Sequence, residues 1–234
     1  CCCSADFCVF LLPRPPRSTR FPYTTLFRSL EQGGYKPALM AGHSLGEYSA
    51  LVCSGVIGFE DAVMLVQKRG EFMQSAVPVG VGAMAAIVGL ADADVIAACE
   101  EAAQQELVSA VNFNSPGQVV IAGHVDAVNR AIESCKSKGA KRALPLPVSE
   151  PFHSRLMLPA AENFAAVLKD INLNEPKIPV LQNYSLTLSS DDTESIKEIL
   201  IKQIYSPVPW VDSLTSFQQK GIQRVIEVGP GKVL

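Results

Sequence analysis

The stretch Pro37-Ala38-Leu39-Met40-Ala41-Gly42-His43-Ser44-Leu45-Gly46 joins a short apolar segment to a Gly-x-Ser-x-Gly motif. Residues 37–41 predict a strand, and residues 45–53 predict a helix that stops at Ser54-Gly55. A strand, this motif and a helix together indicate a nucleophile elbow, in which the serine lies on a strained turn. Ser44 is therefore a candidate nucleophile, with its hydroxyl near the N–H groups of a helix N-terminus. The alternative is a Gly/Ser turn without a catalytic role.

The remaining chain alternates strands and helices around a self-contained unit at 80–148. Inside this unit we expect strands at 84–90, 107–112, 118–122 and 141–148, and helices at 92–104 and 126–138. The order βαββαβ is typical of a ferredoxin-like subdomain. Outside it we expect helices at 59–76, 156–169, 194–204 and 209–220, and strands at 178–184 and 222–228. The predicted fold is α/β, with an α/β-hydrolase-like parallel-sheet domain (30–79 and 149–234) that carries the inserted subdomain.

Residues 1–29 differ in character from everything that follows. Residues 13–20 are rich in proline and arginine and have no apolar period, and residues 17–29 resemble a translated sequencing adapter. We expect 1–29 to be non-native or disordered and leave it out of the predicted fold. Residues 228–234 have the pattern of a strand and turn that lead into a further element. We therefore expect the sequence to be a fragment at both ends.

Composition argues against several classes of function. The net charge is −3 and the sequence has no dense Lys/Arg run, which argues against a nucleic-acid partner. It also has no run of about 18 apolar residues, so no membrane span is predicted. The seven cysteines contain no Cys-x-x-Cys pair and there are only three histidines, so we expect reduced thiols, no metal and a cytoplasmic protein.

A serine nucleophile needs a base, and the candidates are His43, His124 and His153. His43 adjoins Ser44 on a tight turn, where neighbouring side chains point in different directions. His124 follows a strand of the inserted unit, where a surface role is the simpler interpretation. His153 lies in Glu150-Pro151-Phe152-His153-Ser154, a rigid loop at the junction with the outer domain, and is the favoured base. No acid after the serine stands out as a third triad member, so a backbone carbonyl is a candidate to orient His153.

Arg69 indicates the kind of substrate. It falls within the apolar stripe of helix 59–76, at i+7 from Ala62 and i+4 from Leu65, whereas Lys68 and Glu71 point outward. An inward guanidinium is costly unless an anion meets it. The structural alternative is an internal salt bridge, and the functional one is a bidentate clamp for a substrate carboxylate. Ser44, His153 and Arg69 together suggest transfer of an acyl group that carries a free carboxylate.

Four motifs in register resemble the malonyl-CoA:acyl carrier protein transacylase family of bacterial fatty-acid synthesis. They are Gly42-His43-Ser44-Leu45-Gly46-Glu47-Tyr48-Ser49-Ala50, Gln67-Lys68-Arg69-Gly70, Asn112-Phe113-Asn114-Ser115-Pro116-Gly117-Gln118 and Glu227-Val228-Gly229-Pro230-Gly231-Lys232. The resemblance implies a ping-pong transfer from malonyl-CoA to the phosphopantetheine thiol of acyl carrier protein, without a cofactor, by a monomer.

The resemblance also implies roles for individual residues. It makes Ser44 the nucleophile, His153 the base and Arg69 the malonyl clamp. It makes the Leu45 N–H an oxyanion donor and puts the Gln203 carbonyl against His153. It lines the cleft with Asn114 and His43, and Phe152 is similar to the malonyl-selective pattern of related domains.

The sequence departs from the family pattern in one respect, and three rival interpretations stay open. The family's Gly-Gln-Gly oxyanion segment does not occur in this sequence, and losing such a donor costs on the order of 10²–10³ in turnover. With the first strand also lost, we expect an exposed sheet edge, weak activity and aggregation. The rivals are a serine hydrolase of the esterase or patatin-like kind, an acyltransferase domain cut from a polyketide synthase, and a non-enzymatic fragment that has the fold without the function.

Overall fold

The computed structural model describes residues 7–11 and 22–228, with side chains from Phe27 onward. The chain divides into two compact units. The first consists of Cys1–Val66, Asp170–Ile199 and Asp212–Leu234, and the second of Gln67–Lys169 and Leu200–Val211.

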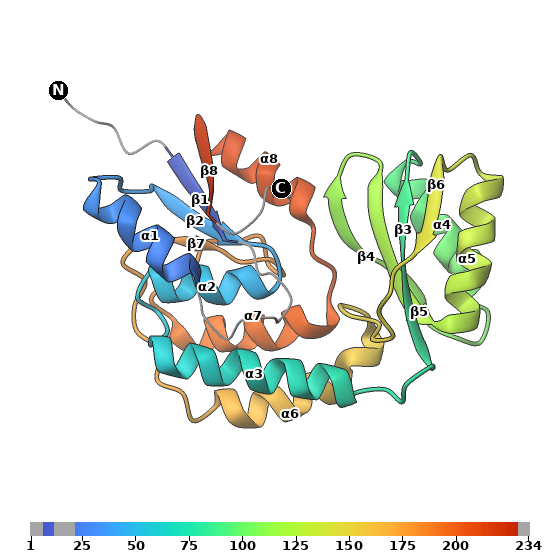
Figure 1. Ribbon diagram of the computed structural model, residues 1–234, viewed down its shortest axis with the longest axis horizontal. Helices are drawn as coiled ribbons and strands as arrows, with labels where there is room; N and C mark the ends of the chain where they lie inside the picture. Colours follow the sequence, from blue (N-terminus) through green and yellow to red (C-terminus); the bar gives the residue numbers. More distant parts are fainter. Residues whose placement is uncertain (1–6, 12–21, 229–234) are drawn as a thin grey trace. The chain divides into compact units, whose positions relative to one another are not determined.

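The first unit is built on a parallel sheet. Its strands are β1 (Phe7–Leu11), β2 (Leu39–Gly42), β7 (Val180–Leu181) and β8 (Arg224–Val228), in the order β7-β2-β1-β8 (Figure 1). Every neighbouring pair is parallel, with Phe10 opposite Ala41 and Leu11 opposite Val228. The predicted parallel α/β architecture is confirmed. Because Met40, Ala41 and Val180 are fully buried, these strands form the centre of the unit.

Two segments of residues 1–29, which we expected to be non-native or disordered, form regular elements of the fold. Phe7–Leu11 forms β1, which pairs with β2 and with β8, and Pro22–Gln32 forms helix α1. The prolines and arginines of residues 13–20 indicate irregular chain, but the short apolar run before them suits a central parallel strand. β2 is therefore paired on both sides, by β1 and β7, and the exposed edge expected there is filled. Residues 12–21, which hold the Pro/Arg-rich run, lie outside the described residues.

Helix α2 (Leu45–Cys53) follows β2 and packs against β1, β2 and β7. Its predicted bounds are confirmed. The helix ends because Gly55 adopts a φ of +84°, which favours glycine. The Gly55 N–H then donates to the Val52 carbonyl and the Val56 N–H to the Leu51 carbonyl, which is a Schellman ending. α1 contacts α2 and β8.

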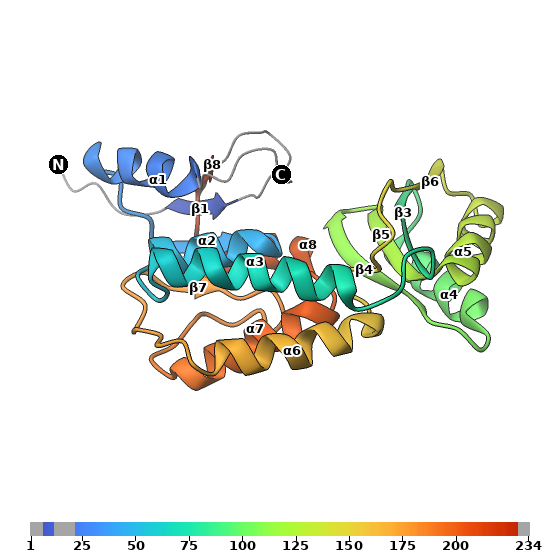
Figure 2. The same ribbon diagram turned by 60° about the horizontal axis from the view of Figure 1, so that its bottom comes forward.

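The second unit contains an antiparallel sheet of β3 (Gly82–Val88), β4 (Val108–Ser115), β5 (Gln118–His124) and β6 (Arg142–Pro145), in the order β4-β5-β3-β6. Helices α4 (Asp92–Ala103) and α5 (Val125–Ser137) cover one face of it (Figures 1 and 2). The chain order β3-α4-β4-β5-α5-β6 confirms the predicted ferredoxin-like subdomain. Its core is formed by small and branched side chains, among them Ala85, Ile87, Val95, Ala98, Val119, Ile121, Val128 and Ala131.

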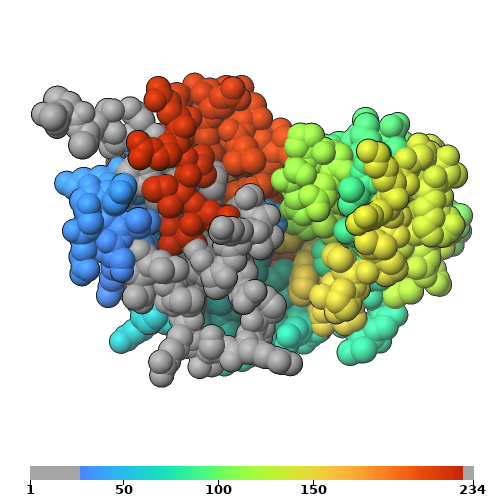
Figure 3. All heavy atoms as spheres, turned by 45° about the horizontal axis from the view of Figure 1, so that its top comes forward, coloured from blue at the N-terminus to red at the C-terminus, as the bar shows by residue number. Residues whose placement is uncertain are grey.

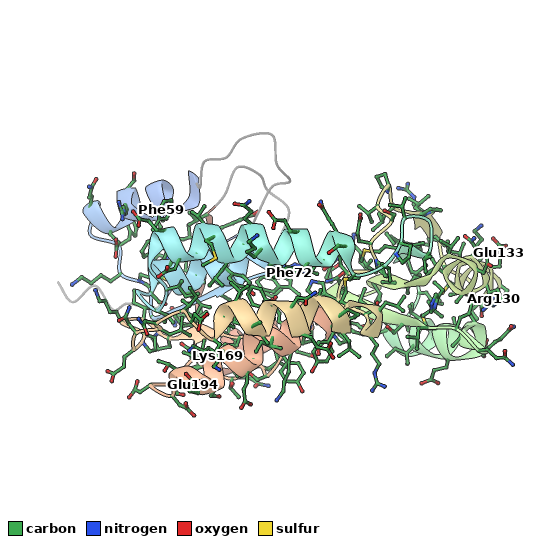
Figure 4. All side chains as sticks on the ribbon, turned by 90° about the horizontal axis from the view of Figure 1, so that it is seen from below. Phe59, Phe72, Arg130, Glu133, Lys169 and Glu194 are labelled. Carbon is green, nitrogen blue, oxygen red and sulfur yellow. The ribbon has the colours of Figure 1, made fainter. Side chains whose placement is uncertain are left out.

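Arg130 on α5 joins the two helices of this subdomain (Figure 4). Its Nε donates to the Ala102 carbonyl at 2.9 Å, and its Nη2 forms an ion pair with Glu106 at 2.8 Å. The guanidinium thereby donates to one of the last carbonyls of α4, which receive no hydrogen bond from an N–H group inside the helix. Only about a third of each side chain is exposed, and the pair also ties the turn after α4 to α5.

The remaining elements are α3 (Phe59–Ser75), a 3₁₀ turn at Arg155–Met157, α6 (Leu158–Leu168), α7 (Thr193–Tyr205) and α8 (Trp210–Gln219). The predicted strand 178–184 is shorter, since the chain turns back at 182–187, where the Gln182 N–H donates to the Thr187 carbonyl. The compact unit around the inserted subdomain is also wider than 80–148. Residues 200–211 join it because Val208 exchanges backbone hydrogen bonds with Val111 and Phe113 of β4. No helix among the described residues is long and apolar enough to cross a bilayer.

Candidate active site

Ser44 occupies the strained position that the motif predicts. It lies between β2 and α2 with φ 52° and ψ −108°, in a region that non-glycine residues rarely adopt. A Cβ on Gly42 would lie 2.0 Å from the Gly46 carbonyl carbon, so the backbones of the two motif glycines are in direct contact. The small residues of the motif are therefore required by the close approach of strand and helix.

The side chain of Asn183 holds this turn through two hydrogen bonds. Its side-chain Oδ1 accepts the Ser44 N–H at 2.7 Å, and its Nδ2 donates to the Gly42 carbonyl at 2.8 Å. Its own N–H donates to Oε2 of Glu47 at 3.1 Å. Asn183 and Glu47 are both buried. A buried amide and carboxylate that bond to backbone in this way fix the conformation of the elbow.

Leu45 and His43 flank the serine. Leu45 is the first residue of α2, where backbone N–H groups have no acceptor inside the helix and where the helix dipole favours negative charge. This is the position at which an oxyanion donor is expected. His43 is half-buried, and its carbonyl accepts the Gly46 N–H at 2.9 Å.

His153 lies in the second unit, directly before the 3₁₀ turn. The chain reaches it from a partly exposed segment that follows β6 (yellow in Figure 3); Pro151, His153 and Ser154 are buried, and Phe152 is half-buried. His153 has a φ of 61° and is almost fully buried. The neighbouring Ser154 hydroxyl donates to the Pro151 carbonyl at 2.6 Å, which closes the turn around the histidine.

The Gln203 carbonyl fixes the tautomer of this histidine. It lies 2.9 Å from Nδ1 of His153, the contact that the family resemblance implies. A carbonyl oxygen can only accept a hydrogen bond, so Nδ1 carries the proton and Nε2 of the neutral ring keeps its lone pair. This tautomer leaves Nε2 as the ring nitrogen that can take a proton, which is what the role expected of His153 requires.

Arg69 lies inward on α3, as its place in the apolar stripe predicts. Its exposed fraction is 6%, and its Nη2 donates to Oε1 of Gln203 at 3.1 Å. Lys68 and Glu71 lie outward and form an exposed ion pair at 2.8 Å, which agrees with their predicted orientation. Gln203 thus bonds to both Arg69 and His153. The structure places Asn114 near the end of β4, in the same unit and half-buried.

The structure brings together His153, Arg69 and Gln203 in the second unit, and Ser44, Leu45 and His43 in the first. Sequence reasoning missed Asn183 and Glu47. A buried carboxylate within the apolar helix 45–53 was an available signal for Glu47. Asn183 lay inside a run interpreted as strand, so its polar side chain carried no signal of its own.

Among the described residues outside this site, His124 has a structural role and two buried cysteines have unreactive thiols. The Nδ1 of His124 accepts the Leu107 N–H at 2.9 Å, which joins β5 to the start of β4. Burial raises the pKa of the Cys53 and Cys99 thiols to about 12, so both are poor nucleophiles near neutral pH. In the described part of the chain, no group of three His, Cys, Asp or Glu residues could hold a metal ion.

A family model described as "Acyl transferase domain" matches residues 23–234, and this chain belongs to that family. Its curated relatives include malonyl CoA-acyl carrier protein transacylase of Escherichia coli strain K12, which is 58% identical over 204 residues. These residues are 87% of this chain and 66% of the relative, so the chain spans slightly less than two thirds of that protein's length. The resemblance stated from the four motifs is thereby confirmed at the level of the family.

Two solved structures support the same placement. An acyl carrier protein S-malonyltransferase from Vibrio cholerae is 54% identical with a TM-score of 0.88, over 90% of this chain and 69% of that one. A malonyl-transacylase solved in complex with a type II polyketide synthase acyl carrier protein is 49% identical with a TM-score of 0.88, over the same shares. The α/β fold with its ferredoxin-like subdomain is thus shared with enzymes of malonyl transfer.

Proposed function

We propose that this chain is an acyltransferase of fatty-acid synthesis that moves a malonyl group from coenzyme A to the phosphopantetheine thiol of acyl carrier protein. The observation that carries the proposal is the buried Arg69, which bonds to the same residue as the candidate base His153. A guanidinium in that setting suits an acyl group with a free carboxylate. The names of the related proteins supply the malonyl group and the carrier protein.

The reaction follows from the roles proposed for Ser44 and His153. The Ser44 hydroxyl attacks the thioester carbonyl while Nε2 of His153 takes its proton. The tetrahedral intermediate expels the coenzyme A thiol, which takes that proton, and leaves a malonyl ester on Ser44. The carrier thiol then attacks the ester, His153 removes the thiol proton, and the proton returns to Ser44 as the ester bond breaks.

The remaining site residues have supporting roles in the proposal. The Leu45 N–H, assisted by the N-terminus of α2, stabilises the oxyanion of each tetrahedral intermediate. Arg69 binds the malonyl carboxylate in a bidentate manner, and Asn114 and His43 line the substrate site. The proposed chemistry uses no cofactor, because acyl transfer between thiols needs only a nucleophile and a base.

We also propose that the protein acts as a monomer in the cytoplasm. The supporting observation for a reducing compartment is that Cys53, Cys99 and Cys135 are free thiols. The sequence lacks a Gly-Gln-Gly segment, and the weak activity expected for that reason stays a prediction. It now rests on the missing oxyanion donor alone, because β1 supplies the strand that was expected to be lost.

The test is incubation with radiolabelled malonyl-CoA, with and without holo acyl carrier protein. We expect a covalent malonyl adduct that survives without the carrier, transfers to it when it is added, and is absent in Ser44→Ala. Arg69→Ala is expected to remove the preference for malonyl-CoA over acetyl-CoA, and Lys68→Ala on the exposed face of α3 is the matched control. Rapid release of free malonate without the carrier would support a serine hydrolase instead.

A further inference from the structure

Gln203 on α7 forms two hydrogen bonds, one through its main-chain carbonyl and one through its side chain. Its main-chain carbonyl accepts from Nδ1 of His153 at 2.9 Å, and its side-chain Oε1 accepts from Nη2 of Arg69 at 3.1 Å. All three residues are buried, with Gln203 itself 1% exposed. All three also belong to the second compact unit, so this arrangement is internal to one unit of the chain.

The side-chain contact matters because a guanidinium binds carboxylate through a planar fork. Two parallel N–H···O bonds form only when an edge of the fork faces the carboxylate and the two groups are close to coplanar, so a partner that holds one nitrogen sets the direction of the others. Burial strengthens this effect, since few rotamers are available to a long side chain in a packed interior. The Gln203 amide oxygen is such a partner for Arg69.

The chemical type of the partner matters as well. A side-chain amide oxygen accepts an N–H bond without bringing a negative charge. It can orient the guanidinium without competing with a bound carboxylate for its charge. A glutamate at the same position would place a carboxylate on Arg69 and would resemble the substrate's own group.

We propose that the side chain of Gln203 is a specificity-determining positioning residue, which orients Arg69 toward carboxylate-bearing acyl groups while its carbonyl orients His153. This inference rests on the proposed function, because it assumes that Arg69 binds the acyl carboxylate. It assigns the two parts of Gln203 to two separable tasks. The carbonyl serves the chemical step for any acyl group, and the amide serves selection among acyl groups.

Substitution separates the two tasks, because every variant keeps the main-chain carbonyl. Gln203→Met removes Oε1 at similar side-chain length. We expect its kcat/KM for malonyl-CoA to fall on the order of tenfold, through KM, since a charge-assisted hydrogen bond is lost. Its kcat/KM for acetyl-CoA should fall several-fold less than that for malonyl-CoA, and its pH–rate profile should keep the shape of the parent's, because the bond to His153 remains.

A second variant tests the charge argument. Gln203→Glu is expected to lower the malonyl rate further than Gln203→Met, on the order of a hundredfold, and to lower the acetyl rate by much less. Glu198→Gln, at an exposed position of the same helix, is the matched control and should leave both rates unchanged. Thermal unfolding of each variant shows whether it is folded, and rates are compared for the folded fraction.

A double-mutant cycle with Arg69→Ala completes the test. If Gln203 acts through Arg69, then Gln203→Met adds no further change to the malonyl/acetyl ratio once Arg69 is removed. Equal losses for both substrates, a shifted pH profile, an unchanged ratio in the single variant or additive effects in the cycle would each overturn the inference. A parent chain without any malonyl preference, or one whose preference survives Arg69→Ala, would instead overturn the proposed function.

Discussion

Asn183 and Ser44, 139 positions apart in the chain, are joined by a 2.7 Å hydrogen bond from the backbone N–H of Ser44 to Oδ1 of the asparagine. The same side chain donates to the Gly42 carbonyl, so it holds the backbone on both sides of His43. A non-glycine residue at a φ of 52° costs on the order of 1–3 kcal/mol and persists only where neighbours enforce it. Asn183 is one of the groups that enforce it.

We predict that Asn183→Ala slows acyl transfer by roughly ten- to a hundredfold in kcat, with little change in KM for malonyl-CoA. The loss of both bonds lets the elbow relax, and small misplacements of a nucleophile are costly. The measurement is steady-state transfer together with the labelling rate of Ser44 by a fluorophosphonate. Tyr184→Ala, at the exposed neighbouring position, is the control. A variant that keeps the parent kcat and labelling rate would show that the elbow keeps its conformation without Asn183.

Gly42→Ala should unfold or severely destabilise the protein, by about 3 kcal/mol or more. Its Cβ would lie 2.0 Å from the Gly46 carbonyl carbon and 2.4 Å from the Glu47 nitrogen, and neither backbone group can move without breaking α2. The comparison is Gly70→Ala, in helix α3, where nothing lies within 4 Å of the added carbon. That change should stabilise by about 0.5–1 kcal/mol. Denaturant unfolding measures both, and equal stability of the two variants would contradict the argument.

Local pattern was enough for much of the fold. The helix predicted at 45–53 is Leu45–Cys53, because an apolar helix between a motif and a Ser-Gly stop has few alternatives. The βαββαβ order was also readable, since strands and helices alternate with clear turns between them. β1 was not predicted, because its apolar run is short and the arginines and prolines after it dominated the composition. The shortened β7 was not predicted either, because an apolar run does not reveal that Asn183 must leave the sheet to reach the elbow.

The site was predictable where one element carries the signal. Ser44 is defined by its motif, and the inward position of Arg69 follows from helical periodicity. The Gln203 carbonyl came only from the family resemblance, because a backbone group leaves no pattern in the sequence. The contacts of Asn183 with Ser44, Glu47 and Gly42 span 136 to 141 positions, and long-range hydrogen bonds of this kind need the fold itself.

The buried thiols should resist alkylation in the native protein. Burial is the main cause that raises the pKa of Cys53 and Cys99 to about 12, so at pH 8 the reactive thiolate is on the order of 10⁻⁴ of each. Burial also raises the pKa of Cys135. We expect peptide mapping after iodoacetamide treatment at pH 8 to find these three unmodified, and to find them fully modified in urea. Reaction should accelerate as the pH rises toward the raised pKa. Fast native alkylation of Cys99 at pH 8 would contradict this.

Gly82→Ala should impair the chemical step from a position outside the site residues. Gly82 begins β3, and an added Cβ would lie 2.4 Å from Cδ of Pro151 and 2.6 Å from the Ser149 carbonyl oxygen. The proline ring cannot rotate away, so the loop must move. Because the Ser154 hydroxyl is bonded to the Pro151 carbonyl, this movement passes to His153 between them.

The expected result for Gly82→Ala is a kcat lowered by about tenfold or more, with a smaller change in KM, since displacing a base weakens the transition state more than substrate binding. Steady-state kinetics of the folded fraction provides the measurement, and Gly70→Ala serves again as the glycine-to-alanine control. If the variant loses stability but its folded fraction keeps the parent kcat, then the loop absorbs the added carbon without moving His153. In that case the rigidity that we ascribe to Pro151 and Ser154 does not reach the base.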